Sequence, residues 1–319
     1  LEPQTPPKLL VKQLCAVRPC AIFAATASIA KLSVEDLRPG LQGPCALVNV
    51  DGMSALLTKP LTGMRRPRRQ GPLCCVAVTS DAAGAPTVVR FEHSSLHWAA
   101  QAWQAHMGIL PEDRVLQLLS PNSLPFVVGV WASLAAGATL LFPPAGMKPG
   151  ADLRTYLHTR HATVFGATPM QLRLLGVEGA SSLASLRLVW AVGSCSKELA
   201  KCWARGRRIV QACSWAGVPA ACVFDVIGDS DSLCPGHKLP LGSALPGCQL
   251  HVLNDRLEHV AEGERGTLFI GGAGVAGGYL GQTGAEQNHI VEMDGLGRLF
   301  RTGDAAWRDA GGSVALWDA

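Results

Sequence analysis

Short apolar segments alternate with longer segments of helical periodicity through the first two thirds of the chain. The segments that predict strands are rich in Val, Leu, Ile and Cys and lie at 73–78, 139–142, 162–165 and 186–192. The segments that predict helices carry apolar residues at three- and four-residue spacing and lie at 97–107, 126–136, 170–175 and 196–204. This alternation predicts an α/β fold with a largely parallel sheet and helices on its faces.

The pattern changes near residue 239, where Gly and Pro become dense. Four short strand-like segments follow, separated by turn residues, at 248–253, 266–270, 298–302 and 313–317. The sequence therefore predicts an α/β part over 1–238 and a smaller β-rich subdomain over 239–319.

Composition excludes several classes of protein. With 319 residues and 48% hydrophobic content, the chain can bury a large core. Lys and Arg exceed Asp and Glu by only 28 to 24, and the basic run Arg65–Arg69 is typical of a solvated loop, so no nucleic-acid partner is expected. The apolar run Leu134–Pro144 is too short to span a membrane.

The eleven cysteines are scattered and lack zinc-site spacing, which favours reduced, buried thiols and no metal site. The chain starts at Leu1 without a Met or a signal pattern, and we interpret it as an internal fragment of a cytoplasmic protein.

One segment has the glycine spacing of a dinucleotide-binding fingerprint but lacks the helix that the fingerprint requires. Gly272–Gly277 matches G-x-G-x-x-G, and Glu292 and Asp294 lie where a ribose carboxylate would stand. The fingerprint needs a helix that opens at its third glycine, whereas 278–284 is rich in turn residues. Tight turns are therefore favoured over an NAD site.

The same glycines belong to a longer pattern. The stretch GERGTLFIGGAGVAGGYLGQTGAEQNHIV, followed by GRLFRTGDAAWRDAGGSVALW, closely resembles the adenylate-forming superfamily, and within it the adenylation domains of non-ribosomal peptide synthetases. SLASLRLVWAVGSCSKELAKCWARGRRIVQA and PLGSALPGCQLHVLNDRLEHVAEGERG resemble its central and linking segments. The resemblance covers most of the chain and is weakest over the first seventy residues.

The resemblance implies a fold and a division of the chain. Residues 1–238 would form the α/β core of an AMP-binding domain, with parallel sheets, flanking helices and an incomplete N-terminus. Residues 239–319 would be the β-rich subdomain of the same domain. The chain ends at Ala319, about where the family's hinge begins, so the C-terminal lid subdomain is expected to be absent.

The resemblance also implies a reaction. Members of the superfamily join a carboxylic acid to AMP, using ATP and Mg²⁺ and releasing pyrophosphate, and then pass the acyl group to a thiol. In peptide synthetases that thiol is the phosphopantetheine of a carrier-protein domain. The expected partners are therefore a carrier domain, neighbouring synthase domains and a small carboxylic acid.

The family's phosphate loop, T-S-G-S-T-G-x-P-K-G, is only partly retained. Thr79, Ser80 and Gly84 match it, but Asp81 replaces a glycine and Thr87 replaces the lysine. A carboxylate here repels a triphosphate, and the loss of about three charged hydrogen bonds costs on the order of 5–9 kcal/mol. The loop is expected to be vestigial.

Three other segments match the nucleotide site by resemblance. Gly193 and Ser194 stand where the family has the G-G-E that lines the adenine, and Cys213 stands where N-x-Y-G-P-T-E has its aromatic residue. Asp304, in R-T-G-D, matches the acid that grips the ribose hydroxyls.

The magnesium ligand of that family is missing from the matching position. Gly217 stands where N-x-Y-G-P-T-E has its glutamate. Asp225, Asp229 and Asp231 follow and are candidate substitutes, although carboxylates in turns or at the surface are the commoner explanation. No residue is assigned a catalytic role.

The expected substrate pocket is apolar. Leu124, Phe126 and Val127 stand where amino-acid-activating members keep an Asp that pairs with the substrate ammonium. An ammonium without a counter-charge is costly to bury, which favours a neutral or apolar acid over an α-amino acid. The alternative is a buried helix start with no pocket behind it. Two functions stay open: an active carboxylate ligase, and an inactive pseudo-adenylation domain that acts as a scaffold or interaction module.

Overall fold

The computed structural model divides the protein into two compact units. The first contains residues 1–92 and 277–287, and the second contains 93–276 and 288–319. The residues that the structure describes are 5–17, 19, 21–25, 46–49, 72–80, 86–144, 147, 150–226, 241–280 and 289–317.

The described part of the first unit has one helix and two small sheets. Its elements are α1 (Pro7–Val17), β1 (Ala21–Ala24), β2 (Ala46–Asn49), β3 (Leu73–Ser80), β4 (Pro86–Glu92) and β14 (Gly278–Tyr279). β1 and β2 pair in parallel, whereas β3, β4 and β14 pair antiparallel with β4 in the middle. Leu10 and Leu14, four residues apart, are buried on one face of α1 and form its apolar stripe.

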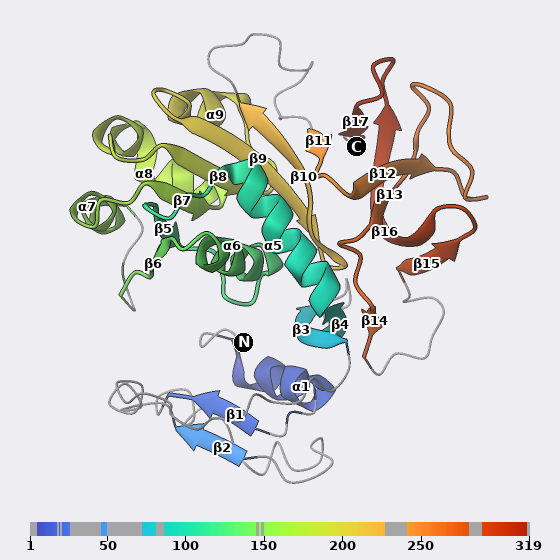
Figure 1. Ribbon diagram of the computed structural model, residues 1–319, viewed down its shortest axis with the longest axis horizontal. Coiled ribbons are helices and arrows are strands. Elements are labelled where there is room, and N and C mark those ends of the chain that lie inside the picture. Colours follow the sequence, from blue (N-terminus) through green and yellow to red (C-terminus); the bar gives the residue numbers. More distant parts are fainter. Residues whose placement is uncertain are drawn as a thin grey trace. The chain divides into compact units, whose positions relative to one another are not determined.

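A seven-stranded sheet is the centre of the second unit (Figure 1). Its strand order is β11-β10-β9-β8-β7-β5-β6, in which β6, β5, β7, β8 and β9 run parallel, β10 pairs antiparallel with β9, and β11 pairs antiparallel with β10. The strands are β5 (Arg114–Gln117), β6 (Thr139–Leu141), β7 (Val164–Ala167), β8 (Leu188–Val192), β9 (Arg208–Trp215), β10 (Val218–Val226) and β11 (Ser243–Ala244). The helices are α5 (His93–Met107), α6 (Leu124–Ala135), α7 (Ala151–Thr159), α8 (Pro169–Ser182) and α9 (Lys197–Trp203).

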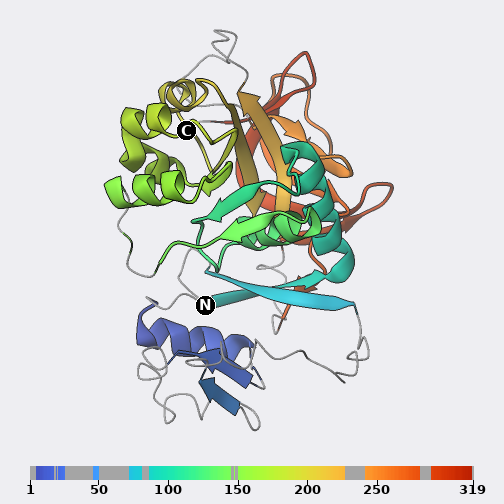
Figure 2. The ribbon, with the colours of Figure 1, turned by 60° about the vertical axis from the view of Figure 1, so that its left-hand side comes forward.

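Helices cover both faces of this sheet (Figure 2). Leu157 of α7 and Trp203 of α9 belong to one buried cluster with Phe165 of β7. On the other face, Trp103 of α5 meets Trp190 of β8 edge to face, with ring centroids 5.8 Å apart. Side chains alternate across a strand, so a parallel sheet covered on both faces requires the near-continuous apolar runs seen in the sequence.

Local sequence signals explain where three of the helices begin. Ser123 caps α6, Ser196 caps α9, and Thr168 forms a capping box with Gln171 at the start of α8. Each cap satisfies backbone N–H groups that have no partner within the helix. Gly176 interrupts α8 with a φ of 65°, which a glycine adopts without steric strain.

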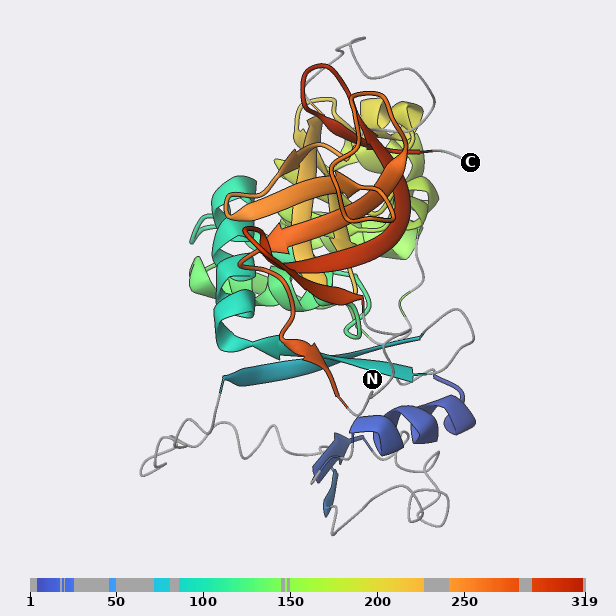
Figure 3. The same cartoon turned by 90° about the vertical axis from the view of Figure 1, so that its right-hand side faces the viewer.

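The β-rich part of the second unit is a five-stranded antiparallel sheet (Figure 3). Its strands are β12 (Cys248–Leu253), β13 (Gly266–Gly272), β15 (Ile290–Met293), β16 (Gly297–Arg308) and β17 (Val314–Leu316). Leu253, Phe269 and Leu299 form its small buried cluster.

The predicted α/β fold with a β-rich subdomain is confirmed, and one strand was missed. The strand predicted at 73–78 and the helix predicted at 97–107 are present as β3 and α5, but β4 lies between them. Pro86, Arg90 and Glu92 obscured the strand pattern, because this strand is only partly apolar. No described helix is both long and apolar enough to cross a bilayer.

Two further expectations concern segments near turns. The G-x-G-x-x-G stretch ends β13 at Gly272 and leads to the short strand β14, so within 272–280 no helix opens there to hold a dinucleotide. The boundary expected between 238 and 239 stays a prediction, because 227–240 lie outside the described residues. Seven cysteines in the described part of the chain are free thiols: Cys15, Cys74, Cys75, Cys195, Cys202, Cys213 and Cys248.

The buried carboxylate of Asp113 links the loops that lead into β5, β7 and β8, at the amino edge of the parallel strands. Asp113 is 1% exposed and accepts hydrogen bonds from the Arg187 guanidinium, from Thr163 Oγ1 at 2.7 Å and from Leu110 N–H at 2.8 Å. Burial alone would raise the pKa of Asp113, but these hydrogen bonds outweigh it and hold the pKa below its ordinary value.

We expect Asp113→Asn to lower the free energy of unfolding by about 2–3 kcal/mol, less than for a fully buried pair because the Arg187 side chain is 40% exposed. A carboxylate with a lowered pKa stabilises the fold above its unfolded pKa of about 3.9, and this contribution is lost as pH falls through the folded pKa. Urea unfolding at neutral pH and below pH 4 measures both effects. The difference between wild type and variant should shrink in acid, while Asp255→Asn, at an exposed turn, should change little. A constant difference across this range contradicts the role given to Asp113.

Candidate functional site

The carboxyl edge of the parallel strands gathers most of the residues expected in the site. α6 begins after β5, Gly193 and Ser194 follow β8 directly, and Cys213 lies near the end of β9. Ligands of open α/β sheets bind at this edge. The structure therefore assembles in one region three segments that the sequence leaves far apart.

A turn after β8 places the first segment. Gly193 has a φ of 102° and donates its N–H to the Ala212 carbonyl of β9 at 3.1 Å. The next residue, Ser194, is exposed, and Cys195 N–H donates to Gln211 Oε1 at 2.8 Å. Burial raises the pKa of the Cys195 thiol to about 11, so this thiol stays protonated at neutral pH.

Asp304 lies on β16 and is held beside the end of β9. Its Oδ2 accepts a hydrogen bond of 2.7 Å from Trp215 Nε1, and its backbone N–H donates to Thr302 Oγ1 at 3.0 Å. Trp215 and Cys213 are two residues apart on β9 and share a face of the strand. Asp304 and Cys213 thus belong to one region, and Trp215 links them.

No space exists for a side chain at the position of the expected magnesium ligand. Gly217 is buried in the β9–β10 turn, and a Cβ atom added there would overlap the Phe300 ring. Phe300 is itself 4% exposed, and the Gly217 carbonyl accepts a hydrogen bond from Ala276 N–H at 2.9 Å. The Phe300 ring therefore occupies the space that a side chain at position 217 would need.

The position that the resemblance gives to the magnesium ligand does not fit a metal ion, because Gly217 has no side chain and no room for one. Among the described residues, no group of three or more His, Cys, Asp or Glu side chains could hold a metal. The side chain of Asp225, and Asp229 and Asp231 entirely, lie outside the described residues. Gly217 therefore supplies no metal ligand and leaves no space for one.

The expected substrate residues form the first turn of α6. Leu124 is 7% exposed and buried, while Phe126 and Val127 are half-buried. Phe126 packs near Phe142, with ring centroids 6.2 Å apart. Phe126 thus has an aromatic neighbour, and the role of the three residues toward a substrate stays a prediction.

Trp190 fills the sheet surface beneath α6. It is completely buried, and it pairs with Gly166 of β7, where a Cβ atom would overlap the indole ring. Gly129 of α6 lies above it, where a Cβ atom would come 2.8 Å from Gln117 Nε2 and 3.4 Å from the indole. Two glycines thus make room for one large ring.

The expected phosphate-loop residues belong to the first unit. Thr79 and Ser80 end β3, where their backbones pair with Thr87 and Pro86 of β4. Their side chains, and Gly84 in the 81–85 segment, lie outside the described residues. Their part in nucleotide binding stays a prediction.

Sequence reasoning missed three aromatic residues of this region: Trp190, Trp215 and Phe300. The available signal was one of size, because Trp215 stands where the resemblance has a proline, two residues before the glycine that replaces the glutamate.

Comparisons with known proteins agree with this fold. The family model described as "AMP-binding enzyme" matches residues 1–280. The chain therefore belongs to this family and is a member of the adenylate-forming superfamily.

Two relatives and one solved structure illustrate the likeness. Novobiocin biosynthesis protein H of Streptomyces niveus is 28% identical over 98% of this chain and 52% of its own length. The probable non-canonical non-ribosomal peptide synthetase CymA of Salinispora arenicola is 31% identical over 72% of this chain and 3% of its own length. The N-terminal subdomain of Klebsiella oxytoca NpsA, solved with 3-hydroxybenzoyl-AMSN, has a TM-score of 0.77 at 21% identity and covers 99% of this chain and 79% of its own. This chain thus spans about half, or far less, of these curated relatives.

Proposed function

We propose that this chain is the nucleoside-binding core of a peptide-synthetase-like adenylation domain whose metal-dependent step is lost. The observation that carries the proposal is the closed position at Gly217, where Phe300 occupies the space of a metal-binding side chain. The retained Asp304 supports nucleoside binding. Its Oδ1 accepts no hydrogen bond from the described residues and is left for a ribose hydroxyl.

In this proposal each residue has a limited role. Asp304 holds the ribose, and Gly193, Ser194 and Cys213 line the adenine. Thr79, Ser80 and Gly84 are what remains of the phosphate loop. Leu124, Phe126 and Val127 favour a neutral or apolar carboxylic acid. The domain would serve as a binding or docking module beside a carrier domain and its phosphopantetheine. The structural neighbour NpsA-ThdA of Klebsiella oxytoca, an artificially fused adenylation-PCP di-domain, supports this partner.

The alternative is an active ligase that forms acyl-AMP and pyrophosphate from ATP and a carboxylic acid. Retention of Asp304 in the R-T-G-D segment favours it. The two functions differ in one measurable property: only the ligase requires Mg²⁺ and a triphosphate.

Calorimetry with AMP and with ATP plus Mg²⁺ tests the proposal. We expect AMP to bind at least as well as ATP, and Asp304→Ala to weaken AMP binding roughly tenfold or more, because a charge-assisted hydrogen bond is lost. Trp215→Phe is the matched control, since it removes the indole donor and leaves the carboxylate, so AMP affinity should be kept or raised.

Pyrophosphate exchange separates the alternatives. The proposal expects no acid-dependent exchange of pyrophosphate into ATP by this chain across a panel of aryl, fatty and amino acids. Tighter binding of ATP that depends on Mg²⁺, together with exchange above a heat-killed sample, establishes the ligase instead.

A further inference from the structure

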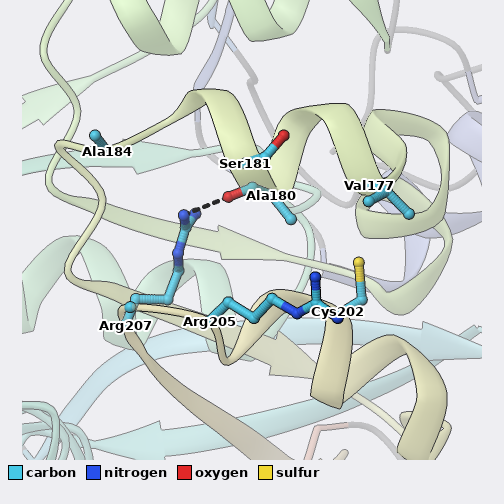
Figure 4. Close-up of a pocket in the computed structure, with 8 residues that line it drawn as sticks. Val177, Ala180, Ser181, Ala184, Cys202, Arg205 and Arg207 are labelled. Carbon is cyan, nitrogen blue, oxygen red and sulfur yellow. Dashed lines mark hydrogen bonds between the residues drawn. The ribbon is translucent and has the colours of Figure 1, made fainter.

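A pocket of about 360 Å³ lies between α8 and the turn that connects α9 to β9 (Figure 4). Val177, Ala180 and Ala184 supply its apolar lining, and Arg205 and Arg207 supply its charge. Ser181, Cys202 and Gly206 complete the described lining, and none of its residues is acidic. Its volume lies within the range of small-molecule sites.

This pocket is separate from the candidate nucleotide site. Arg207 immediately precedes β9, whereas Cys213 and Trp215 lie at the other end of the same strand. The ends of an eight-residue strand are roughly 23 Å apart. The pocket therefore opens at the amino edge of the parallel strands, and the proposed nucleoside site lies at the carboxyl edge.

The Arg207 guanidinium is held in place but uses little of its hydrogen-bonding capacity. Nη2 donates to the Ala180 carbonyl of α8 (Figure 4). The guanidinium carbon lies 5.6 Å from the Trp203 ring centroid. Nε and Nη1 are buried without a partner. Burial lowers the pKa of the guanidinium, because its charged form loses hydration, and the Cys202 thiol acts weakly in the opposite direction. Arg207 is thus a shielded cation without a counter-charge among the described side chains.

The second cation is freely available. Arg205 is exposed, and Figure 4 shows its side chain lying along the pocket beside Cys202. Within the described part of the chain neither Arg205 nor Arg207 forms an ion pair with a carboxylate. Two guanidinium groups beside apolar methyl groups match a ligand with a carboxylate at one end and an apolar body at the other.

We infer that this pocket binds a small organic carboxylate with an apolar body. The carboxylate accepts hydrogen bonds from Arg205 and, after a small side-chain rotation, from the unused N–H groups of Arg207. The apolar body lies against Val177, Ala180 and Ala184. No covalent step is involved, and the site is independent of the proposed nucleoside site.

Cys202 provides a local readout, because its half-buried thiol lines the pocket. The experiment measures the rate of Cys202 alkylation by N-ethylmaleimide in the full chain, by peptide mass spectrometry, with benzoate as the probe. At a benzoate concentration ten times its dissociation constant, alkylation should be about tenfold slower. Benzamide, which has the same shape without the charge, should give no protection.

Variants assign the effect to the arginines. Arg205→Gln should weaken benzoate protection of Cys202 roughly tenfold, and it should fold normally, since Arg205 is exposed and unpaired among the described residues. Arg256→Gln, at an exposed turn, is the matched control and should change nothing. Arg207→Lys keeps the charge and removes the planar fork, so protection should be intermediate.

The same digest reports the thiol of Cys213 in the proposed nucleoside region. Benzoate protection of Cys213 without protection of Cys202 would place the ligand at the acyl site and overturn the inference. The inference also fails if benzamide protects Cys202 equally, if benzoate gives no protection, or if Arg205→Gln leaves protection unchanged. None of these outcomes depends on whether AMP binds.

Discussion

Replacing Gly217 with glutamate will destabilise the protein by about 4–6 kcal/mol and will not restore a magnesium site. A Cβ atom at this position already overlaps the Phe300 ring, and overpacking a core costs about 1–3 kcal/mol. The carboxylate would in addition be buried without a partner, which costs several kcal/mol more. Thermal and urea unfolding measure the loss, and calorimetry with Mg²⁺ measures any gain in metal affinity.

Two further variants isolate the steric cause. Gly311→Glu is the matched control, because Gly311 is exposed and its only close neighbour is the Asp309 side chain at 3.4 Å, so stability should change by less than about 0.5 kcal/mol. In a Phe300→Ala background, Gly217→Glu should cost less than in the wild type, since the ring is gone. Equal costs in the two backgrounds, or Mg²⁺ binding by Gly217→Glu alone, would refute the packing explanation.

Trp190→Ala should lower the free energy of unfolding by about 3–5 kcal/mol, because a fully buried indole would leave a cavity that its neighbours cannot fill. Gly166 and Gly129 pack directly around the indole and have no side chains to move into the space. Its Nε1 has no hydrogen-bond partner in the described part of the chain, so packing, including the edge-to-face contact with Trp103, accounts for its contribution.

The control for this prediction is Trp131→Ala on α6, where the side chain is 52% exposed. A change within about 0.5 kcal/mol is expected there. The cavity left by Trp190→Ala is apolar, and indole added to the variant should recover part of the lost stability. Similar losses in both variants, or no effect of indole on Trp190→Ala, would show that Trp190 does not fill a closed space.

The sequence determined the elements whose signals are local. The helix at 196–204 was predicted because apolar residues recur at helical spacing, and α9 runs from Lys197 to Trp203 with Ser196 as its cap. The strand at 248–253 was predicted with the bounds that β12 has. The alternation of apolar runs with helices likewise determined the parallel sheet, because both of its faces must be covered.

Only the tertiary structure decided what the candidate site can hold. The sequence shows that Gly217 stands in place of a glutamate, but the closure of that position depends on Phe300, which is 83 residues away in the sequence and belongs to another sheet. The hydrogen bond between Trp215 and Asp304 likewise joins positions 89 residues apart. Contacts of this kind arise from how β9 and β16 pack, and no periodicity or motif along the chain encodes which side chain fills the space left by another. The pocket between Arg205, Arg207 and α8 also depends on tertiary packing. Its two sides, residues 177–184 and 202–207, meet only because α8 and α9 cover one face of the sheet.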